Sequence, residues 1–411
     1  MCRSLPQKGD YYGCGGGLVM GKRVAKEVSI AIADAVKLAR AEVIAAYPIT
    51  PQTHIVEHLS ELVANGELDA EYITVESEHS AMSAALGAVA TGARTFTSTS
   101  SQGLALMHEI LFIAPALRLP VVMVVANRAL SAPISIWNDH SDIMAQRDIG
   151  WIQMWAENGQ EAVDMVIQAF RIAEDRNVMF PTIVNIDGFT LSHVIEPIEL
   201  PDQEEVDAFL PAFKPKYKLD PRKPLTMGPV GVPEIYFEAK RAQDEAFKNS
   251  RRVINRVWKD WAGRFGRQYN AVETYRLEEA EVAILIMGSM AETAMTAVDK
   301  MREEGKKVGL IRLRLWRPFP VQDFRRAISG IPVLAVVDRA LTIGGVGGPV
   351  GTEVRAALYA AARRPRVVNF IAGLGGRDIT VEDFEEMADR AAQYRKKRPK
   401  EAYEYIGVRE V

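Results

Sequence analysis

From residue 24 onward, apolar positions along the chain follow two alternating periods. Val28, Ile32 and Val36 recur at the spacing of one helix face, whereas residues 42–46 form a short apolar run typical of a buried parallel strand. Strand and helix patterns then alternate with short connections, which predicts an α/β fold with a parallel sheet covered by helices on both faces. The predicted strands are 42–46, 71–75, 94–98, 120–126, 151–156 and 181–186, and the predicted helices between them are 52–65, 78–92, 103–116 and 159–175.

Prolines interrupt this pattern between residues 196 and 232. Because proline lacks an N–H group and clashes in a helix interior, their spacing excludes a continuous helix or a central strand and predicts an ordered connector that wraps over a surface. Residues 234–266 then predict a charged amphipathic helix, with Trp258 and Trp261 on its apolar side. A smaller parallel α/β unit follows, with predicted strands 281–287, 307–313, 332–338 and 366–371 and predicted helices 291–304, 321–329 and 350–362.

These patterns divide the chain into five predicted parts. Residues 1–19 carry Cys2 and Cys14 among several glycines, and we expect a disordered tail or a start assigned too early, with Met20 the true one. The spacing of the two cysteines fits no standard metal site. The other parts are a larger parallel-sheet domain (20–195), a Pro-rich connector with the amphipathic helix (196–275), a smaller α/β domain (276–393) and a charged, solvated tail (394–411).

Composition narrows the class of protein. The 411 residues carry 50 Lys plus Arg against 53 Asp plus Glu, and this net charge of −3 argues against nucleic acid or an anionic membrane as the main partner. With only two cysteines, both near the start, the body of the chain has no ligands for an iron–sulfur cluster or a Cys-bound zinc. We expect no metal bound by this chain. No signal peptide and no apolar run of about 18 residues occurs, so a cytoplasmic location is expected.

Four loops that follow predicted strands carry chemically unusual residues. They contain Ile49-Thr50-Pro51, Glu78, Ser100-Ser101 and Arg128, and ligands of open parallel sheets bind at the carboxyl ends of strands. Each also has an ordinary structural explanation. A glutamate is favoured at a helix start, serines cap helices, prolines end strands, and an arginine forms surface ion pairs. The glycine-rich run 344–348 lacks the Lys-Ser/Thr of a phosphate loop and is only a weak phosphate-binding signal.

Long motifs in a fixed order carry a more specific signal. They are Tyr-Pro-Ile-Thr-Pro-Gln-Thr at 47–53, Val-Glu-Ser-Glu-His-Ser-Ala at 75–81, Thr-Ser-Ser-Gln-Gly-Leu-Ala-Leu-Met-His-Glu at 99–109, and the run from Asn127 to Asp142. With these motifs the chain closely resembles the alpha subunits of the 2-oxoacid:ferredoxin oxidoreductase family, and within it the pyruvate:ferredoxin oxidoreductases (pyruvate synthases). The resemblance covers roughly residues 24–390.

The resemblance implies a subunit of a hetero-oligomeric enzyme of anaerobic metabolism. Such enzymes use thiamine diphosphate to decarboxylate a 2-oxoacid, pass electrons through iron–sulfur clusters to ferredoxin, and transfer the acyl group to coenzyme A. Residues 20–195 would be a pyrimidine-binding domain of the thiamine-enzyme type, and residues 276–393 a transketolase C-terminal-like domain. The beta subunit would hold the diphosphate and Mg²⁺, and [4Fe-4S] clusters would lie on the partner subunits, which are beta, gamma and delta. The missing cluster cysteines and the missing diphosphate motif agree with this division.

The resemblance also implies roles for individual residues. Glu78 would bond to N1′ of the thiamine pyrimidine, which favours the imino tautomer that removes the C2 proton, and a buried site strengthens such a bond. Glu76 lies two residues earlier and would point the same way on a strand, so spacing alone does not choose between them. Thr50 and Arg128 would lie beside the reacting carbon and bind the substrate carboxylate. The implied cofactor-binding residues are Ile49, Thr50, Pro51, Glu78 and Ser101.

Three alternatives concern the activity. An oxalate-using relative carries arginine where Thr50 stands, so Thr50 argues against oxalate. Branched-chain (2-oxoisovalerate) enzymes tend to read Met-Ala-Pro-Pro after the arginine, whereas this chain reads Leu-Ser-Ala-Pro at 130–133, which favours pyruvate. A noncatalytic assembly subunit is the third alternative, and the intact set of Thr50, Glu78 and Arg128 argues against it. The physiological direction of the reaction and the copy number of the complex stay open.

Overall fold

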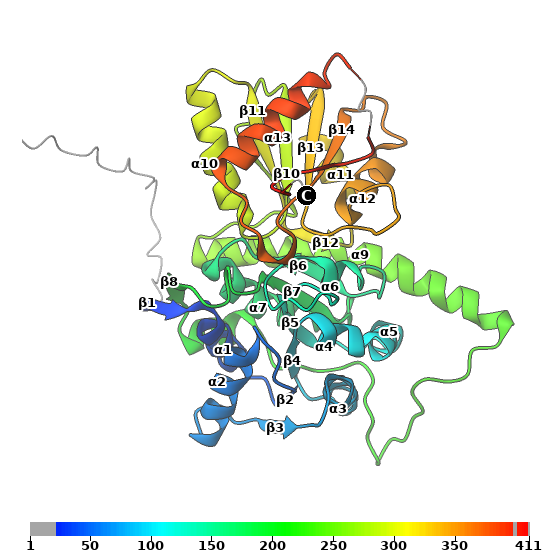
Figure 1. The fold of residues 1–411 in the computed structure, drawn as a ribbon. Helices are drawn as coiled ribbons and strands as arrows, with labels where there is room; N and C mark the ends of the chain where they lie inside the picture. The colour runs from blue at the N-terminus through cyan, green and yellow to red at the C-terminus, as the bar shows by residue number, and fades with distance from the viewer. Residues whose placement is uncertain (1–21, 398–400, 410–411) are drawn as a thin grey trace, which may run out of the picture.

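The computed structural model describes residues 22–397 and 401–409. The predictions for residues 1–19, including Cys2 and Cys14, lie outside the described residues. The predicted α/β class is confirmed, because two parallel-sheet units stack on each other (Figure 1). The larger unit holds a seven-stranded sheet in the order β12-β6-β7-β5-β4-β2-β3. Its strands are β2 Val43–Ala46, β3 Glu71–Thr74, β4 Thr95–Thr99, β5 Val122–Asn127, β6 Ile152–Trp155, β7 Thr182–Asp187 and β12 Leu315–Arg317.

Six strands of this sheet run parallel, as the apolar runs predict, and β12 pairs antiparallel with β6. Residues 315–317 lie inside the range 276–393 that the sequence assigns to the smaller domain. A three-residue strand shows no periodicity of its own, and its pairing with Met154 arises only when the two units meet. The helices are α1 Val28–Leu38, α2 Thr53–Ala64, α3 Glu78–Thr91, α4 Ser101–Leu106, α5 His108–Ala116, α6 Ser141–Met144 and α7 Gly159–Ala173.

The predicted helix 103–116 is two helices, α4 and α5, which meet at Met107. Pro115 lies inside α5 and has no N–H group to offer the carbonyl of Leu111. The indole Nε1 of Trp151 donates to that carbonyl instead, over 2.7 Å. The side chain of Trp151, 40 residues after Leu111 in the sequence, thus satisfies a carbonyl group that the helix leaves open.

The predicted part 196–275 contains three elements that the sequence does not predict, and the last of them, β9 (Val272–Tyr275), belongs to the sheet of the smaller unit, so that unit begins before residue 276. The other two lie in its Pro-rich stretch. β8 (Ile195–Leu200) pairs antiparallel with β1 (Lys22–Glu27) in a two-stranded ribbon, and α8 spans Gln203–Phe209. Pro197 fits β8 because a two-stranded ribbon is all edge. Residues 210–232 contain no helix or strand, and Leu219 N donates to Ala90 O over 2.8 Å.

The predicted amphipathic helix is α9, Pro233–Phe265. Its first half projects from the molecule, whereas its second half packs on the larger unit (Figure 1). Trp258 and Trp261 are buried there, as the apolar side of the pattern predicts. Within the described residues, no helix has the length and apolar character needed to cross a membrane.

The smaller unit holds a six-stranded sheet in the order β15-β14-β13-β10-β11-β9. The expectation of a purely solvated tail at 394–411 is wrong for β15 (Glu404–Tyr405), which extends the sheet beside β14, and Ile406 next to it is buried. Its elements are β9 Val272–Tyr275, β10 Val282–Ile286, α10 Met290–Glu303, β11 Val308–Leu313, α11 Val321–Ala327, β13 Val333–Asp338, α12 Pro349–Leu358, β14 Arg366–Ile371, a 3-10 turn Leu374–Gly376 and α13 Val381–Gln393.

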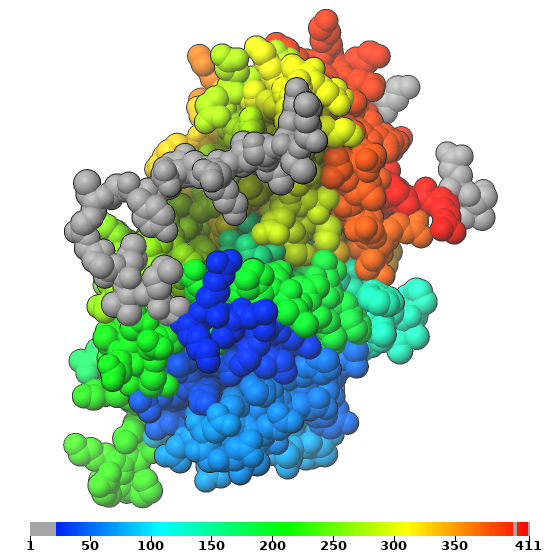
Figure 2. Space-filling model, turned by 90° about the vertical axis from the view of Figure 1, so that its left-hand side faces the viewer, coloured from blue at the N-terminus to red at the C-terminus, as the bar shows by residue number. Residues whose placement is uncertain are grey.

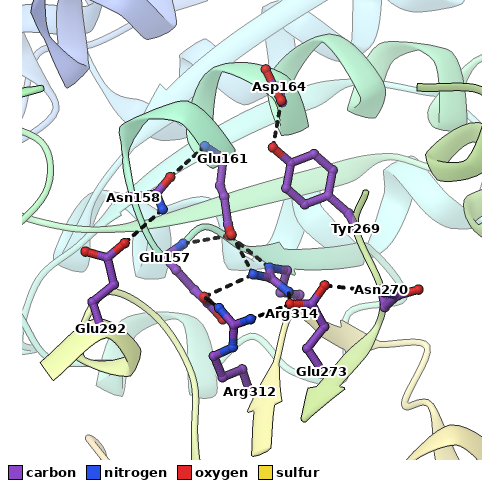
Figure 3. Close-up of polar contacts among 10 residues, drawn as sticks. All are labelled: Glu157, Asn158, Glu161, Asp164, Tyr269, Asn270, Glu273, Glu292, Arg312 and Arg314. Carbon is purple, nitrogen blue, oxygen red and sulfur yellow. Dashed lines mark hydrogen bonds and ion pairs between the residues drawn. The ribbon is translucent and has the colours of Figure 1, made fainter. Parts of the chain in front are cut away.

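A buried ionic network joins the start of α7 to the smaller unit (Figure 3). Arg314, which is 3% exposed, donates to Glu161 over 2.6 Å and to Glu157 over 3.0 Å, and Arg312 donates to Glu157 over 2.6 Å. Burial, and then the charge of Glu161, raises the pKa of Glu157 to about 7. The space-filling view shows the two units in contact over a broad face (Figure 2). The apolar core is continuous there, because side chains of both sheets belong to one cluster.

Candidate functional site

Glu78 is the first residue of α3, and the residue is buried. The side chain of Ser77 caps the helix by accepting from Ser80 N over 3.2 Å, and Glu78 is 7% exposed. Its carboxyl lies against Gly103 of α4, where an added Cβ would lie 2.5 Å from Glu78 Oε1 and 2.6 Å from Thr99 Oγ1. Only glycine leaves this space. Thr99 Oγ1 is buried without a hydrogen-bond partner within the described residues.

Glu76 differs from Glu78 in its exposure and in its hydrogen bonds. Glu76 is exposed, and its Oε1 accepts from Ser80 Oγ over 2.9 Å. A backbone hydrogen bond and then the Ser80 bond lower the pKa of Glu76. The strand β3 ends at Thr74, so the two-residue period of a strand does not extend to either glutamate. Burial at the helix start, which spacing could not reveal, separates the two side chains.

Arg128 directly follows β5 and is 7% exposed. Its Nη1 donates to the backbone carbonyl of Thr50 over 3.0 Å, and its Nε donates to Ser135 O over 3.0 Å. Burial lowers the pKa of the guanidinium, and the charge of Asp142 opposes this effect. The structure therefore brings together Thr50 and Arg128, which lie 78 residues apart in the sequence. No hydrogen bond within the described residues uses Nη2 of Arg128.

A hydrogen bond from the side chain of Gln52 stabilises the turn that carries Ile49, Thr50 and Pro51. Gln52 is fully buried, and its Nε2 donates to Tyr47 O over 2.8 Å. The Thr50 residue itself is exposed, whereas Pro51 is buried. Gln52 thus stabilises the turn, and Thr50 is exposed at the carboxyl end of β2.

Ser101 begins α4 and is fully buried. Its φ of 45° lies in the left-handed region, which a residue with a Cβ rarely adopts. The hydroxyl donates to Ala129 O over 2.6 Å, and the backbone N–H donates to Asp142 Oδ2 over 3.0 Å. These bonds tie α4 to the loop after β5. Glu78 has no hydrogen bond to Thr50 or Arg128 within the described residues, so α4 links the two parts of the site.

Sequence reasoning assigned no role to Asp142 or Asp187. Asp187 ends β7 and is fully buried, and it accepts from His140 Nε2, Arg339 Nη1 and Ser289 N, each over 2.9 Å. Burial alone would raise its pKa, but Arg339 and His140 hold the pKa of Asp187 well below its usual range. The only available signal was that Asp142 and His140 lie inside the long motif 127–142.

The glycine-rich run 344–348 does not form an open phosphate site. The backbone N–H groups of Val350 and Gly351, at the start of α12, donate to Asp338 over 2.8 Å each, and Gly348 N donates to Asn369 Oδ1 over 2.8 Å. These N–H groups at the start of α12, where an anion would bind, already have protein acceptors. Among the described residues, no group of three or more His, Cys, Asp or Glu side chains is placed to hold a metal ion.

Curated proteins of similar sequence extend over nearly the whole chain. The pyruvate synthase subunit PorA of Pyrococcus abyssi is 49% identical over 94% of this chain and 98% of that protein. The PorA subunit of Methanocaldococcus jannaschii is 52% identical over 86% of this chain and 91% of that protein. The ketoisovalerate oxidoreductase subunit VorA of Pyrococcus horikoshii is 46% identical over 85% of this chain and 89% of that protein.

Solved structures show the same fold at low sequence identity. A chain of the 2-oxoglutarate:ferredoxin oxidoreductase from Magnetococcus marinus, solved with 2-oxoglutarate, coenzyme A and succinyl-CoA bound, superposes with a TM-score of 0.67 at 20% identity, over 92% of this chain and 65% of that one. A split-gene transketolase, described as an inactive beta4 tetramer, superposes with a TM-score of 0.53 at 12% identity, over 90% of this chain and 98% of that one.

Two family models cover most of the described chain. The one described as "Pyruvate flavodoxin/ferredoxin oxidoreductase, thiamine diP-bdg" matches residues 34–259 and so contains Glu78, Thr50 and Arg128. The one described as "Pyruvate:ferredoxin oxidoreductase core domain II" matches residues 280–384. With these matches and the identity to PorA subunits over nearly its full length, the chain belongs to the pyruvate:flavodoxin/ferredoxin oxidoreductase family.

Proposed function

We propose that this chain is the alpha subunit of a pyruvate synthase, which catalyses pyruvate + CoA + oxidised ferredoxin = acetyl-CoA + CO₂ + reduced ferredoxin. The observation that carries the proposal is the buried Glu78 carboxyl at a helix start, facing Gly103, on the same sheet edge as the joined Arg128 and Thr50. An enzyme of this kind needs an acid–base group for the cofactor and a cation for the substrate at one edge. The identity to PorA subunits supports the choice of reaction.

The residues around Glu78 fit the pyrimidine half of thiamine diphosphate. A buried carboxyl, a glycine that leaves space in front of it and the unpartnered hydroxyl of Thr99 suit a flat ring with polar edges. When bound, the cofactor supplies the carbon nucleophile that decarboxylation of a 2-oxoacid requires. Glu78 would hold its proton toward N1′ of the ring. Ile49, Pro51 and Ser101 would shape the wall of the site, with Ser101 acting through α4.

Arg128 and Thr50 are proposed to bind the 2-oxoacid. The guanidinium is anchored through Nε and Nη1, so its remaining N–H groups can take the substrate carboxylate without losing their position. A carboxylate that enters a site closed to water needs such a donor, because an unpaired buried charge is costly. The Thr50 side chain is small enough to leave room for a methyl group.

The rest of the reaction requires partner subunits. We infer that a beta subunit supplies the diphosphate and Mg²⁺ contacts, that [4Fe-4S] clusters lie on partner subunits including a ferredoxin-like delta chain, and that a gamma subunit completes the complex. Coenzyme A and ferredoxin are the co-substrates. The described part of this chain contains no cysteine and no group of three or more His, Cys, Asp or Glu side chains placed to hold a metal ion.

The test is turnover by the reconstituted complex, read as CoA-dependent reduction of viologen or ferredoxin. Glu78→Gln keeps the size of the side chain but weakens the bond to the ring, so turnover should fall by about 10²-fold or more. Glu76→Gln is the matched control, because Glu76 is exposed and the only other side chain that it bonds within the described residues is that of Ser80. The site assignment fails if Glu76→Gln is the damaging change. The subunit assignment fails if the isolated chain reduces the dye.

A branched-chain 2-oxoacid such as 2-oxoisovalerate is the second candidate substrate, and the 46% identity to a VorA subunit favours keeping it. A pocket that separates methyl from isopropyl needs only about 1–3 kcal/mol, which few residues can supply. A panel of 2-oxoacids on the purified complex decides between the two. We expect pyruvate to have the highest kcat/KM, and a higher value for 2-oxoisovalerate would reassign the substrate.

A further inference from the structure

The carboxylate of Asp142 lies at the centre of the loops that form the proposed site. Asp142 belongs to α6 and is 1% exposed. Its Oδ2 accepts from two backbone N–H groups, those of Ser101 and Arg128, each over 3.0 Å. Its Oδ1 accepts from Asn127 Nδ2 over 3.1 Å and from Ile143 N over 2.7 Å. One buried side chain thus collects donors from the ends of β4 and β5 and from its own helix.

The two backbone donors belong to the two halves of the site. Ser101 begins α4, the helix whose Gly103 faces Glu78, and Arg128 is the proposed substrate-binding residue. The left-handed φ of Ser101 costs about 1–2 kcal/mol and must be held by surrounding contacts. The N–H bond to Asp142 is one of them, and the hydroxyl bond to Ala129 O is another. Loss of the carboxylate would free both loops together.

No cationic side chain bonds this carboxylate within the described residues. Burial raises the pKa of Asp142 to about 7, and the bonds from Arg128 N and Ser101 N oppose that effect. A carboxyl group is costly to bury. The hydrogen bonds from its four donors must therefore offset the free energy lost when the group is removed from water. Within the described residues its four hydrogen-bond donors are Ser101 N, Arg128 N, Asn127 Nδ2 and Ile143 N, and it has no hydrogen bond to Glu78.

We propose that Asp142 is a positioning residue, which couples the loop after β4 to the loop after β5 and thereby sets the place of Arg128 relative to α4 and Glu78. This inference rests on the proposed function for its kinetic consequence. Its structural consequence, the coupling of the two loops, is independent of any substrate.

Asp338 provides a matched control in the other sheet. It is 1% exposed and accepts from Val350 N, Gly351 N and Asn369 Nδ2, each over 2.8 Å, and burial raises its pKa to about 6. Asp142→Asn and Asp338→Asn therefore remove the same kind of buried carboxylate, with the same kind of donors, from two sheets. Only the first is expected to alter substrate binding.

The kinetic experiment uses the reconstituted complex. Asp142→Asn places an N–H₂ or a single carbonyl where four donors converge, so KM for pyruvate should rise by about tenfold or more, with thiamine diphosphate content within about twofold of wild type. Asp338→Asn should leave KM within about twofold. The inference is overturned if KM is unchanged in Asp142→Asn, or if both variants raise it equally. Should Asp142→Asn not assemble, Asp142→Glu keeps the charge but shifts the acceptor by one methylene. A KM within about twofold of wild type in that variant also overturns the inference.

Hydrogen exchange on the full chain without substrate separates this inference from the proposed function. In Asp142→Asn, amides of both loops, 99–107 and 127–140, should exchange at least about tenfold faster, while Asp338→Asn leaves them unchanged. Acceleration in one loop only, or in neither, overturns the coupling. If both loops respond but the wild-type complex does not turn over pyruvate, the proposed function fails and the positioning role of Asp142 stands.

Discussion

The carboxyl ends of the strands serve different purposes in the two sheets. In the seven-stranded sheet, the loops after β2, β4 and β5 carry Thr50, Ser101 and Arg128 and bond to one another. In the six-stranded sheet, the loops after β10 and β13 carry Ser289 and Arg339, and both donate to Asp187 of the larger unit. Ligands of open sheets bind at such edges, but the second edge is covered by the first unit. The position of the strand ends therefore identifies the edge of a sheet where a ligand could bind, but it does not show whether that edge is accessible in the folded chain.

The covered edge of the six-stranded sheet contacts the loop that carries Arg128 in the larger unit. His140 N donates to Arg339 O over 2.8 Å, and Gly375 N donates to Asp139 Oδ2 over 3.1 Å. A Cβ on Gly376 would lie 2.4 Å from Trp137 Cβ. These contacts hold residues 135–140, the segment whose Ser135 carbonyl accepts from Arg128 Nε. The smaller unit therefore contributes to the position of Arg128 without supplying a residue to the site.

The largest expected effect concerns the covered edge. Arg339→Ala removes the arginine partner of the fully buried Asp187, and removing one member of a buried pair costs about 3–5 kcal/mol in the free energy of unfolding. Urea denaturation of the full chain measures it. Lys248→Ala breaks an exposed pair with Asp244 and should cost at most about 0.5 kcal/mol. If Arg339→Ala and Lys248→Ala lower the free energy of unfolding equally, the buried Arg339–Asp187 pair does not stabilise the contact between the two units.

The buried Asp338 should make stability depend on pH. Burial raises its pKa from 3.8 to about 6, so the folded state holds the proton more tightly than the unfolded state. The protonated Asp338 stabilises the fold fully below about pH 4. As the pH rises through about 6, the free energy of unfolding falls by up to about 3 kcal/mol. The difference in unfolding free energy between wild type and Asp338→Asn should therefore shrink over this interval. A difference that grows with pH would show that the folded carboxylate is stabilised in its charged form.

Gly103→Ala tests the open edge. The added Cβ would lie 2.5 Å from Glu78 Oε1, so the carboxyl group must move, and turnover of the complex should fall by about 10²-fold. Gly87 of α3 has no atom within 4 Å of an added Cβ, and Gly87→Ala should retain activity and add about 0.5–1 kcal/mol of stability. Normal turnover by Gly103→Ala would remove the steric argument for the placement of Glu78.

The smallest expected effect concerns Arg128, which follows β5 in the larger unit, and its control is Arg355 of α12 in the smaller unit. Arg128→Ala should lower kcat/KM for pyruvate by about 10–100-fold, mainly through KM, with little change in cofactor content. Arg355 donates to the carbonyls of Val346 and Ala402 beside the covered sheet, and Arg355→Ala should leave kinetics within about twofold. If Arg128→Ala is equally mild, Arg128 is a structural residue and the substrate assignment fails there.

Several features could be predicted from the sequence because they depend on near neighbours. Continuous apolar runs placed the parallel strands, and the period of the apolar side chains placed Trp258 and Trp261 on the packed face of α9. The long motifs led to the family, which the comparisons confirm. The roles of Glu78, Thr50 and Arg128, and the five-part division of the chain, remain predictions.

Other features were decided only by the tertiary structure, because they join residues that are distant in sequence. β12 has three residues and becomes a strand by pairing with β6, and β8 contains Pro197 and becomes one by pairing with β1. Glu76 and Glu78 look equivalent in sequence, yet only Glu78 is covered, because α4 packs against the start of α3. Asp142 and Asp187 resemble any surface aspartate until the donors that surround them converge. A local period encodes which face of an element is apolar, whereas the surroundings of a polar side chain depend on which segments the completed fold brings against it.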